Sequence, residues 1–183
     1  MSVRDIVAVA LLAAFIAVLG LFPAIPVPVI PVPITAQLLG IILSGAILGA
    51  KRGFAACLLF LILVAAGLPL LSGGRGGISV FFAPTSGYLI SFPFTAGFIG
   101  FFYSLFRNSL TPAKEILIMM VGVFCINHLF GIIGLVFIGG IDFSKAFLGD
   151  LIFIPGDMVK IVLAYLIASR LRRALPDLMD GNR

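Results

Sequence analysis

Six long stretches of apolar residues alternate with short connectors along the 183-residue chain. They cover residues 6–22, 34–50, 54–71, 88–106, 116–138 and 148–169. A helix needs about 20 apolar residues to cross about 30 Å of hydrocarbon, and these stretches approach that length. They are continuous, whereas the strands of a membrane β-barrel alternate apolar and polar residues. The pattern predicts an all-α integral membrane protein, a compact bundle of six transmembrane helices in a single membrane domain over 1–183.

The composition excludes a soluble globular domain. Hydrophobic residues make up 62% of the chain and charged residues 10%, with a mean hydropathy of +1.29. Soluble domains contain about 25% charged residues. The first apolar stretch runs into Leu21-Phe22-Pro23 instead of a small-residue cleavage site. We therefore expect it to be a retained span and not a signal peptide.

The net charge of +5 is distributed in a way that predicts membrane orientation. Cytoplasmic connectors are enriched in Lys and Arg. If the N-terminus is cytoplasmic, alternate connectors place nine basic residues inside: Arg4, Lys51, Arg52, Arg107, Lys114, Arg170, Arg172, Arg173 and Arg183. The outer connectors contain only Arg75 and Lys145. We therefore expect both termini to be cytoplasmic. Because the positive charges are explained as orientation signals, we expect the chain to have no nucleic acid partner.

Two outer connectors have unusual chemistry. Residues 23–33 carry proline at almost every second position and no charge. Proline fixes φ and removes a donor, so this segment should be extended, and its apolar side chains should pack over the mouth of the bundle. Residues 72–77 place Arg75 among four glycines, where the backbone can approach a ligand and the guanidinium can bind a carboxylate. A flexible turn that touches lipid headgroups is the alternative.

Asp157 and Lys160 are the most informative polar pair. Each charge costs about 2.5–3.5 kcal/mol at the middle of a membrane. Their i, i+3 spacing places both on one helix face. A cyclic urea or amide, with N–H donors beside a carbonyl, would complement the two side chains. A structural ion pair, or a lysine that reaches the membrane surface, is the alternative.

Further polar residues are candidate ligand contacts or helix–helix hydrogen bonds. These are Thr35, Gln37, Asn127 and His128, with Thr85 and Tyr88 just after the glycine connector. For Gln37 and His128 we favour the helix–helix role. Ala10, Ala13, Ala14 and Ala17 form a stripe of small residues, which suits either packing within the bundle or the docking of another membrane subunit.

Enzyme motifs are absent from the sequence. It has no metalloprotease, nucleophile-elbow or Walker signature, and its two cysteines have no metal-binding spacing. We therefore expect no enzymatic activity, no catalytic residue, no metal and no cofactor.

Four segments together resemble the BioY family, the biotin-binding S components of energy-coupling factor (ECF) transporters. They are PVPITAQ at 31–37, GGRGG at 73–77, PTSGY at 84–88 and PGDMVK at 155–160, in the family's order over nearly the whole chain. The resemblance implies a six-helix bundle in the plasma membrane of a bacterium or archaeon, with biotin bound in a pocket open to the outside.

The same resemblance implies roles for individual residues. Asp157 and Lys160 match the pair that would hold the ureido ring, and Arg75 and Asn127 would meet the ring edge or the valerate carboxylate, in an order left open. Gly74, Gly76, Thr35, Gln37, Thr85 and Tyr88 complete the expected substrate-binding set. The resemblance also implies docking of a membrane T component on Ala10/Ala14 and Ala13/Ala17, with ATP used only by partner subunits.

Other functions remain as alternatives at this stage. An S component of the same architecture for riboflavin or thiamine is the nearest, although the Asp/Lys pair and the arginine loop suit a urea plus a carboxylate. A membrane enzyme that acts on lipid would need a nucleophile beside a base, and no such grouping is evident. The sequence leaves open the affinity, whether a homo-oligomer forms, and whether the chain works alone or with a dedicated or shared ATPase module.

Overall fold

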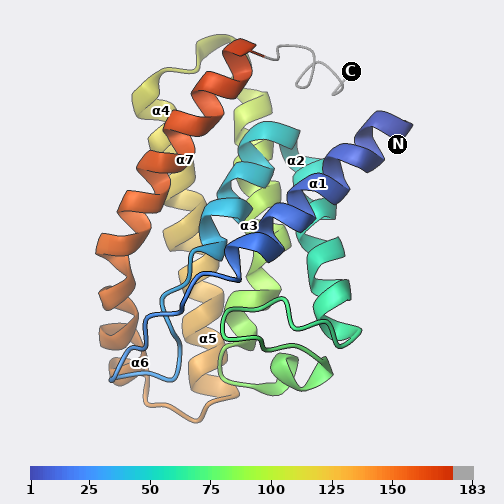
Figure 1. Cartoon of the computed structure of the whole chain (residues 1–183). Coiled ribbons are helices and arrows are strands. Elements are labelled where there is room, and N and C mark those ends of the chain that lie inside the picture. The colour runs from blue at the N-terminus through green and yellow to red at the C-terminus, as the bar shows by residue number, and fades with distance from the viewer. Residues whose placement is uncertain (175–183) are drawn as a thin grey trace.

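The computed structural model describes residues 1–174, and these form helices joined by loops. Arg183, counted above among the cytoplasmic charges, lies outside the described residues. The α-helices are α1 (Val3–Leu19), α2 (Gln37–Ala65), α3 (Ser86–Leu105), α4 (Pro112–Val121), α5 (Leu129–Phe137), α6 (Phe143–Asp150) and α7 (Ile154–Ala174). Short 3₁₀-helices cover Ile78–Phe82, Arg107–Ser109 and Leu151–Phe153, and a π-helix covers Gly122–His128. The predicted all-helical fold class is confirmed for these residues (Figure 1).

Two of the predicted spans belong to α2, which is broken at Gly49. This residue has φ 78° and ψ −177°, a conformation that residues with a Cβ rarely adopt. The chain folds back there. The close approach of Gly53 to Ser44 shows this, since a Cβ on Gly53 would lie 2.7 Å from the carbonyl oxygen of Ser44. In an unbroken helix, nine residues would separate these two positions by more than 13 Å. α2 is therefore a hairpin of two helical arms.

The last two predicted spans are each assembled from several segments. The π-helix joins α4 and α5 into one helix over Pro112–Phe137, and α6 leads into α7 over Phe143–Ala174. With α3 and with α2 taken as one unit, these make four helical units within residues 1–174 that are long and apolar enough to cross a membrane. α1, at 17 residues, is shorter, and it packs against α2 at a slant (Figure 1).

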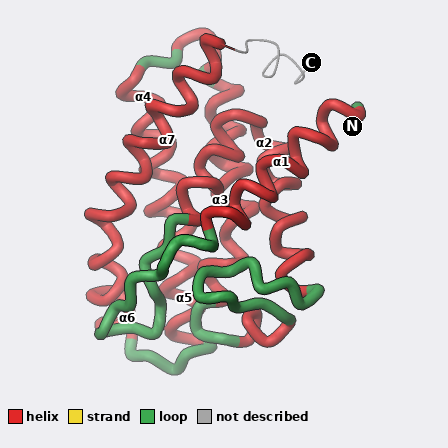
Figure 2. The backbone as a smooth tube through the Cα atoms, viewed as in Figure 1, coloured by secondary structure: helices red, strands yellow, loops and turns green. Residues whose placement is uncertain are grey.

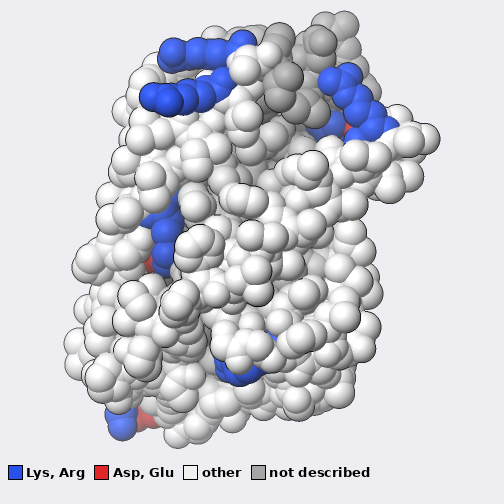
Figure 3. All heavy atoms as spheres, in the orientation of Figure 1, with Lys and Arg blue, Asp and Glu red and all other residues white. Residues whose placement is uncertain are grey.

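The two ends of the bundle differ in structure and charge. The N-terminus and the last turn of α7 lie at one end, and the long loops of residues 20–36 and 66–85 lie at the other (Figure 2). At the first end, Arg52 donates to Asp5 at 2.9 Å. The hydrogen bond from the backbone of Ser2, and then the one from Arg52, hold the pKa of the Asp5 carboxyl below its usual value. Lys and Arg gather at this end, and most of the visible face between it and the looped end is uncharged, apart from one group of basic and acidic atoms at mid-height (Figure 3).

Close backbone contacts hold α2 and α3 together in the core. A Cβ on Gly45 would lie 2.3 Å from the carbonyl oxygen of Ala96, and one on Gly100 would lie 2.3 Å from the carbonyl carbon of Gly49. Neither neighbour can move without a shift of a whole helix. Small residues therefore set the spacing of the two helices, as expected where apolar lipid offers no hydrophobic driving force for their association.

Gly100→Ala should destabilise the protein, whereas Gly97→Ala should not. Both glycines lie within α3, so each substitution gains the same helix propensity, about 1 kcal/mol. The new Cβ would overlap the backbone at Gly49 in the first variant, but it would make an ordinary 3.5 Å contact with Phe54 in the second. We expect overpacking to cost Gly100→Ala about 1–3 kcal/mol beyond that gain. Thermal unfolding in detergent measures the difference, and equal midpoints for the two variants would show that this contact does not limit stability.

Candidate functional site

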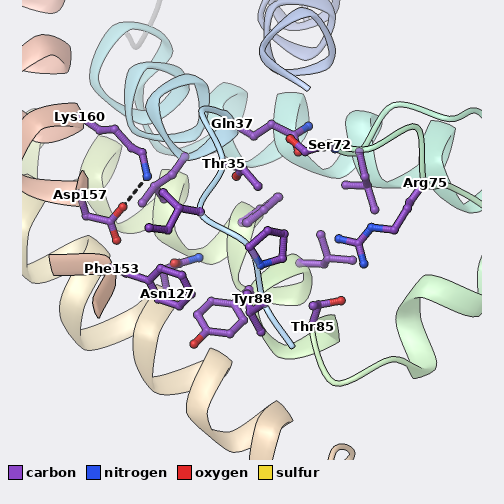
Figure 4. Close-up of a pocket in the computed structure, with 17 residues that line it drawn as sticks. Thr35, Gln37, Ser72, Arg75, Thr85, Tyr88, Asn127, Phe153, Asp157 and Lys160 are labelled. Atoms are coloured by element: carbon purple, nitrogen blue, oxygen red, sulfur yellow. Dashed lines mark hydrogen bonds and ion pairs between the residues drawn. The ribbon is translucent and has the colours of Figure 1, made fainter. Parts of the chain in front are cut away.

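A cavity of about 80 Å³ lies near the looped end, between α2, α3, the π-helix and α7 (Figure 4). Eight of the ten predicted binding residues line it: Thr35, Gln37, Arg75, Thr85, Tyr88, Asn127, Asp157 and Lys160. The remaining lining residues are Ser72 and the apolar Val32, Pro33, Ile34, Leu38, Leu71, Leu89, Phe92 and Phe153. The site is therefore an apolar chamber with a few polar groups, as in most small-molecule sites.

The proline-rich loop forms one wall of this cavity. Ile25 and Ile34 exchange backbone hydrogen bonds of 3.0 and 2.8 Å, which close the loop on itself. Val27, Ile30 and Val32 are buried beneath it. The apolar loop thus packs over the mouth of the bundle, as its composition predicts.

A tight turn between Leu71 and Arg75 presents the arginine to the cavity. Gly73 and Gly74 have φ values of 81° and 69°, so both occupy the left-handed region that glycine tolerates best. The Leu71 N–H donates to the Arg75 carbonyl at 3.0 Å, which closes the turn. Gly74 and Gly76, predicted as binding residues, do not line the cavity. They shape the backbone instead, since a Cβ on Gly76 would lie 2.2 Å from the Leu68 carbonyl oxygen.

Asp157 and Lys160 meet at the opposite side of the cavity from Arg75 (Figure 4). Both come from the first turns of α7, and Lys160 Nζ donates to Asp157 Oδ1 at 2.6 Å. The aspartate is only 3% exposed. A buried carboxylate and an ammonium thus lie side by side, where they can accept and donate hydrogen bonds in a low-dielectric environment.

Two residues outside the predicted set continue this pair into the bundle. The second oxygen of Asp157 lies 3.0 Å from Nε2 of His128, and Nδ1 of His128 lies 2.6 Å from Oδ2 of Asp150. The Tyr88 hydroxyl donates to Oδ1 of Asp150 at 2.6 Å. We refer to Lys160, Asp157, His128, Asp150 and Tyr88 as the buried polar chain. With a proton on each ring nitrogen, His128 and Lys160 balance the charge of the two carboxylates.

The π-helix explains how His128 reaches both carboxylates. Its wider turn changes the direction of the side chains that follow, a device often found at functional sites. Asn127 and His128, at its end, are 5% and 4% exposed. The sequence carries one signal for the second carboxylate, because Asp150 and Asp157 are seven residues apart, which is two helical turns.

Two of the polar side chains that line the cavity form hydrogen bonds with other residues of the chain. Gln37 donates to the carbonyls of Ile16 and Leu70 and accepts from the Ser72 N–H, which fits the helix-bridging role that we favour from the sequence. Asn127 donates to Ser91 at 2.6 Å.

Two other hydroxyls have no such partner. Ser72 Oγ and Thr85 Oγ1 are buried, line the cavity on the side of Arg75, and form no hydrogen bond with any described residue. Buried polar atoms are nearly always paired, so these two are available to a ligand.

The alanine stripe of α1 has two different environments. Ala10 and Ala14 are exposed, whereas Ala13 is buried and Ala17 is half-buried against the core. Only the Ala10/Ala14 half of the predicted docking surface is therefore open to another subunit.

Comparison with known proteins places this geometry in a family. The sequence model of the BioY family matches residues 1–177. The biotin transporter BioY of Rhizobium etli is 44% identical over 172 residues, covering 91% of this chain and 92% of that protein. The probable biotin transporter BioY of Bacillus subtilis is 39% identical over 171 residues, covering 93% and 91%.

A solved structure matches the fold as well as the sequence. The crystal structure of the S-component for biotin from an ECF-type ABC transporter superimposes with a TM-score of 0.90 at 38% identity, covering 93% of this chain and 92% of that one. These relatives are transport proteins, not enzymes. The resemblance that the four sequence segments indicate is confirmed, and the chain belongs to the BioY family.

Proposed function

We propose that this chain is the biotin-binding subunit of an ECF transporter, which captures biotin at the looped end and delivers it inward. The observation that carries the proposal is the cavity itself. It has a buried carboxylate–ammonium pair on one side and an arginine on the other. Biotin carries a cyclic urea at one end and a carboxylate at the other, so its two polar ends match the two sides of the cavity.

The urea binds at Asp157 and Lys160 in this proposal. Asp157 accepts from a ureido N–H, and Lys160 donates to the ureido carbonyl. The hydrogen bond from His128, whose other ring nitrogen is held by Asp150, restrains the position of the Asp157 carboxylate, so the ligand meets a preorganised acceptor. A vitamin without this donor–acceptor pattern would leave two buried charges poorly satisfied, which is a strong basis for selectivity. Thiamine has no carbonyl beside a ring N–H, and riboflavin, which has one, carries no carboxylate for Arg75.

The valerate carboxylate binds at Arg75, with Ser72 and Thr85 as additional donors. Arginine can hold a carboxylate with two parallel hydrogen bonds. The two unpartnered hydroxyls lie on the same side of the cavity and support this orientation over the reverse. Asn127, Phe153 and the other apolar lining residues would then contact the rings and the chain methylenes, at about 0.8 kcal/mol for each buried methylene.

The loops must move for the ligand to enter. The open space of about 80 Å³ is smaller than the 300–1,000 Å³ that is usual for ligand pockets. The loops 20–36 and 66–85 form the outer wall, and no helix has to unfold for them to separate. We propose that they open to admit biotin and close again over it.

Topology and partners complete the proposal. We infer six membrane crossings, with the two arms of α2 counted separately and α1 as the first. Both termini face the cytoplasm of a bacterium or archaeon, in line with the positive charge at that end. The energy comes from ATP-hydrolysing subunits through a membrane T component, which docks at Ala10 and Ala14. The chain carries no cofactor of its own.

Removing either charge of the helix pair should weaken biotin binding. We expect Asp157→Asn and Lys160→Met each to raise the Kd at least about 30-fold, because each leaves a buried partner unpaired and removes a charge-assisted hydrogen bond, about 2 kcal/mol. Isothermal titration calorimetry is the measurement, since the chain has no tryptophan.

The chain offers matched controls for both changes at the same end of the bundle. Asp142→Asn preserves the cap of α6, because asparagine caps a helix as well as aspartate does. Lys145→Met removes one exposed positive charge. Both controls should bind like the wild type. If Asp157→Asn also bound biotin with unchanged affinity, the pair would be a structural ion pair only.

Arg75→Gln should remove the preference for a free carboxylate. The wild type should bind biotin at least about 10-fold more tightly than biotin methyl ester, because the ester loses the charge-assisted bonds to the guanidinium. The variant should bind the two ligands about equally. If the substitution instead weakened both by the same factor, Arg75 would contact the part that they share, and the proposed orientation would be wrong.

A further inference from the structure

A second and larger cavity lies at the basic end of the bundle, remote from the proposed biotin site. Its volume is about 550 Å³. It is lined by the turn of α2 at Gly49, the last turn of α3, the first turns of α4 and the last three turns of α7. These segments come together where the apolar helices end.

The lining of this cavity is strongly basic. Four arginines face it: Arg52, Arg107, Arg172 and Arg173. Glu115 is the one acidic side chain among its described lining residues. Asp5, which is not in the lining, balances Arg52 through the 2.9 Å ion pair. The described lining therefore carries an excess of positive charge.

Arg172 is held rigidly but is only partly satisfied. One of its terminal nitrogens, Nη2, pairs with Glu115, whose same oxygen also accepts from the Tyr103 hydroxyl at 3.1 Å. The guanidinium lies over the Tyr103 ring, 5.1 Å from its centroid. The other terminal nitrogen, Nη1, is buried and forms no hydrogen bond with any described residue. A buried charged donor without an acceptor is costly, so this nitrogen is available to an acceptor, and an anionic oxygen binds a guanidinium most strongly.

We propose that this cavity binds the phosphate-bearing headgroup of an anionic phospholipid, with Arg172 Nη1 as the central donor and Arg107 and Arg173 at the rim. Basic pockets between helix ends at the membrane surface suit such headgroups. Apolar side chains beside the cavity favour a lipid over a free phosphate ion. Leu105, the last residue of α3, is 60% exposed, and Leu117, in the second turn of α4, is 58% exposed. They can contact the acyl chains while the arginines hold the phosphate.

The test is the thermal unfolding of the whole chain in a neutral detergent, with added phosphatidylglycerol, cardiolipin, phosphatidylcholine or inorganic phosphate. Phosphatidylglycerol and cardiolipin should raise the midpoint by about 5 °C, because a ligand that binds only the folded state stabilises it. Phosphatidylcholine and inorganic phosphate should raise it by less than half as much. An equal shift with phosphatidylcholine would overturn the requirement for an anionic headgroup, and an equal shift with phosphate would overturn the lipid as the ligand.

Arg172→Gln and Arg170→Gln form a matched pair on α7. They remove the same charge, but Arg170 is exposed and does not line the cavity. We expect the lipid-dependent shift to fall by at least half in Arg172→Gln and to persist in Arg170→Gln. A persistent shift in both would overturn the site. If Arg172→Gln does not fold, Arg173→Gln tests the same rim from an exposed position, and native mass spectrometry counts the phosphatidylglycerol that each variant retains. Retention equal to the wild type would again overturn the site.

Discussion

Asp150 and Asp157 lie in the interior of an apolar bundle, where an unpaired carboxylate costs several kcal/mol. The buried polar chain keeps them there. It links α3 through Tyr88, the π-helix through His128, α6 through Asp150 and α7 through Asp157 and Lys160, so four helical segments must dock correctly for every charge to be balanced. The same arrangement leaves Asp157 and Lys160 facing the cavity. The constraint that fixes the packing of the helices therefore also prepares the ligand site.

Small residues and loops supply the rest of the site. Glycine contacts between α2 and α3 set the helix spacing. Gly73 and Gly74, whose backbones are in the left-handed region, turn the chain so that Arg75 reaches the cavity. The proline-rich loop covers the chamber with apolar side chains and one pair of backbone hydrogen bonds. Rigid helices thus carry the buried charges, whereas loops carry the arginine, as expected if the ligand enters between the loops.

Much of the fold and of the candidate site could be predicted from the sequence, because the length of an apolar stretch and the position of a charge can be read from the local sequence. The charges at Lys51 and Arg52 correctly indicate a break between two apolar stretches, although the turn itself is at Gly49. The i, i+3 spacing correctly brings Asp157 and Lys160 together. The helix–helix role favoured for His128 agrees with its hydrogen bonds to Asp150 and Asp157. The identity of these partners could not be predicted, since a single histidine in an apolar helix gives no indication of them, and a π-helix has no clear sequence signature.

Other features depend on tertiary packing and could not be predicted in the same way. The alanine spacing on α1 predicts one stripe, but the slant of that helix against α2 buries Ala13 and leaves Ala10 exposed. The arginines near the end of α7 look like simple orientation signals in the sequence. Only the folded structure shows that Arg172 lies against Tyr103 and Glu115 beside a large cavity.

The central claim is that the chamber at the looped end binds biotin, and calorimetric titration of the purified wild-type protein tests it most directly. The titration is carried out at two temperatures. Burial of apolar surface gives binding a change in heat capacity, so the binding enthalpy varies with temperature and can be zero at one of the two temperatures but not at both. The account predicts one biotin per chain, with a Kd below about 1 μM, and no binding of riboflavin or thiamine at the same concentrations. Folded protein that gave no heat with biotin at either temperature, or that bound thiamine or riboflavin more tightly, would contradict it.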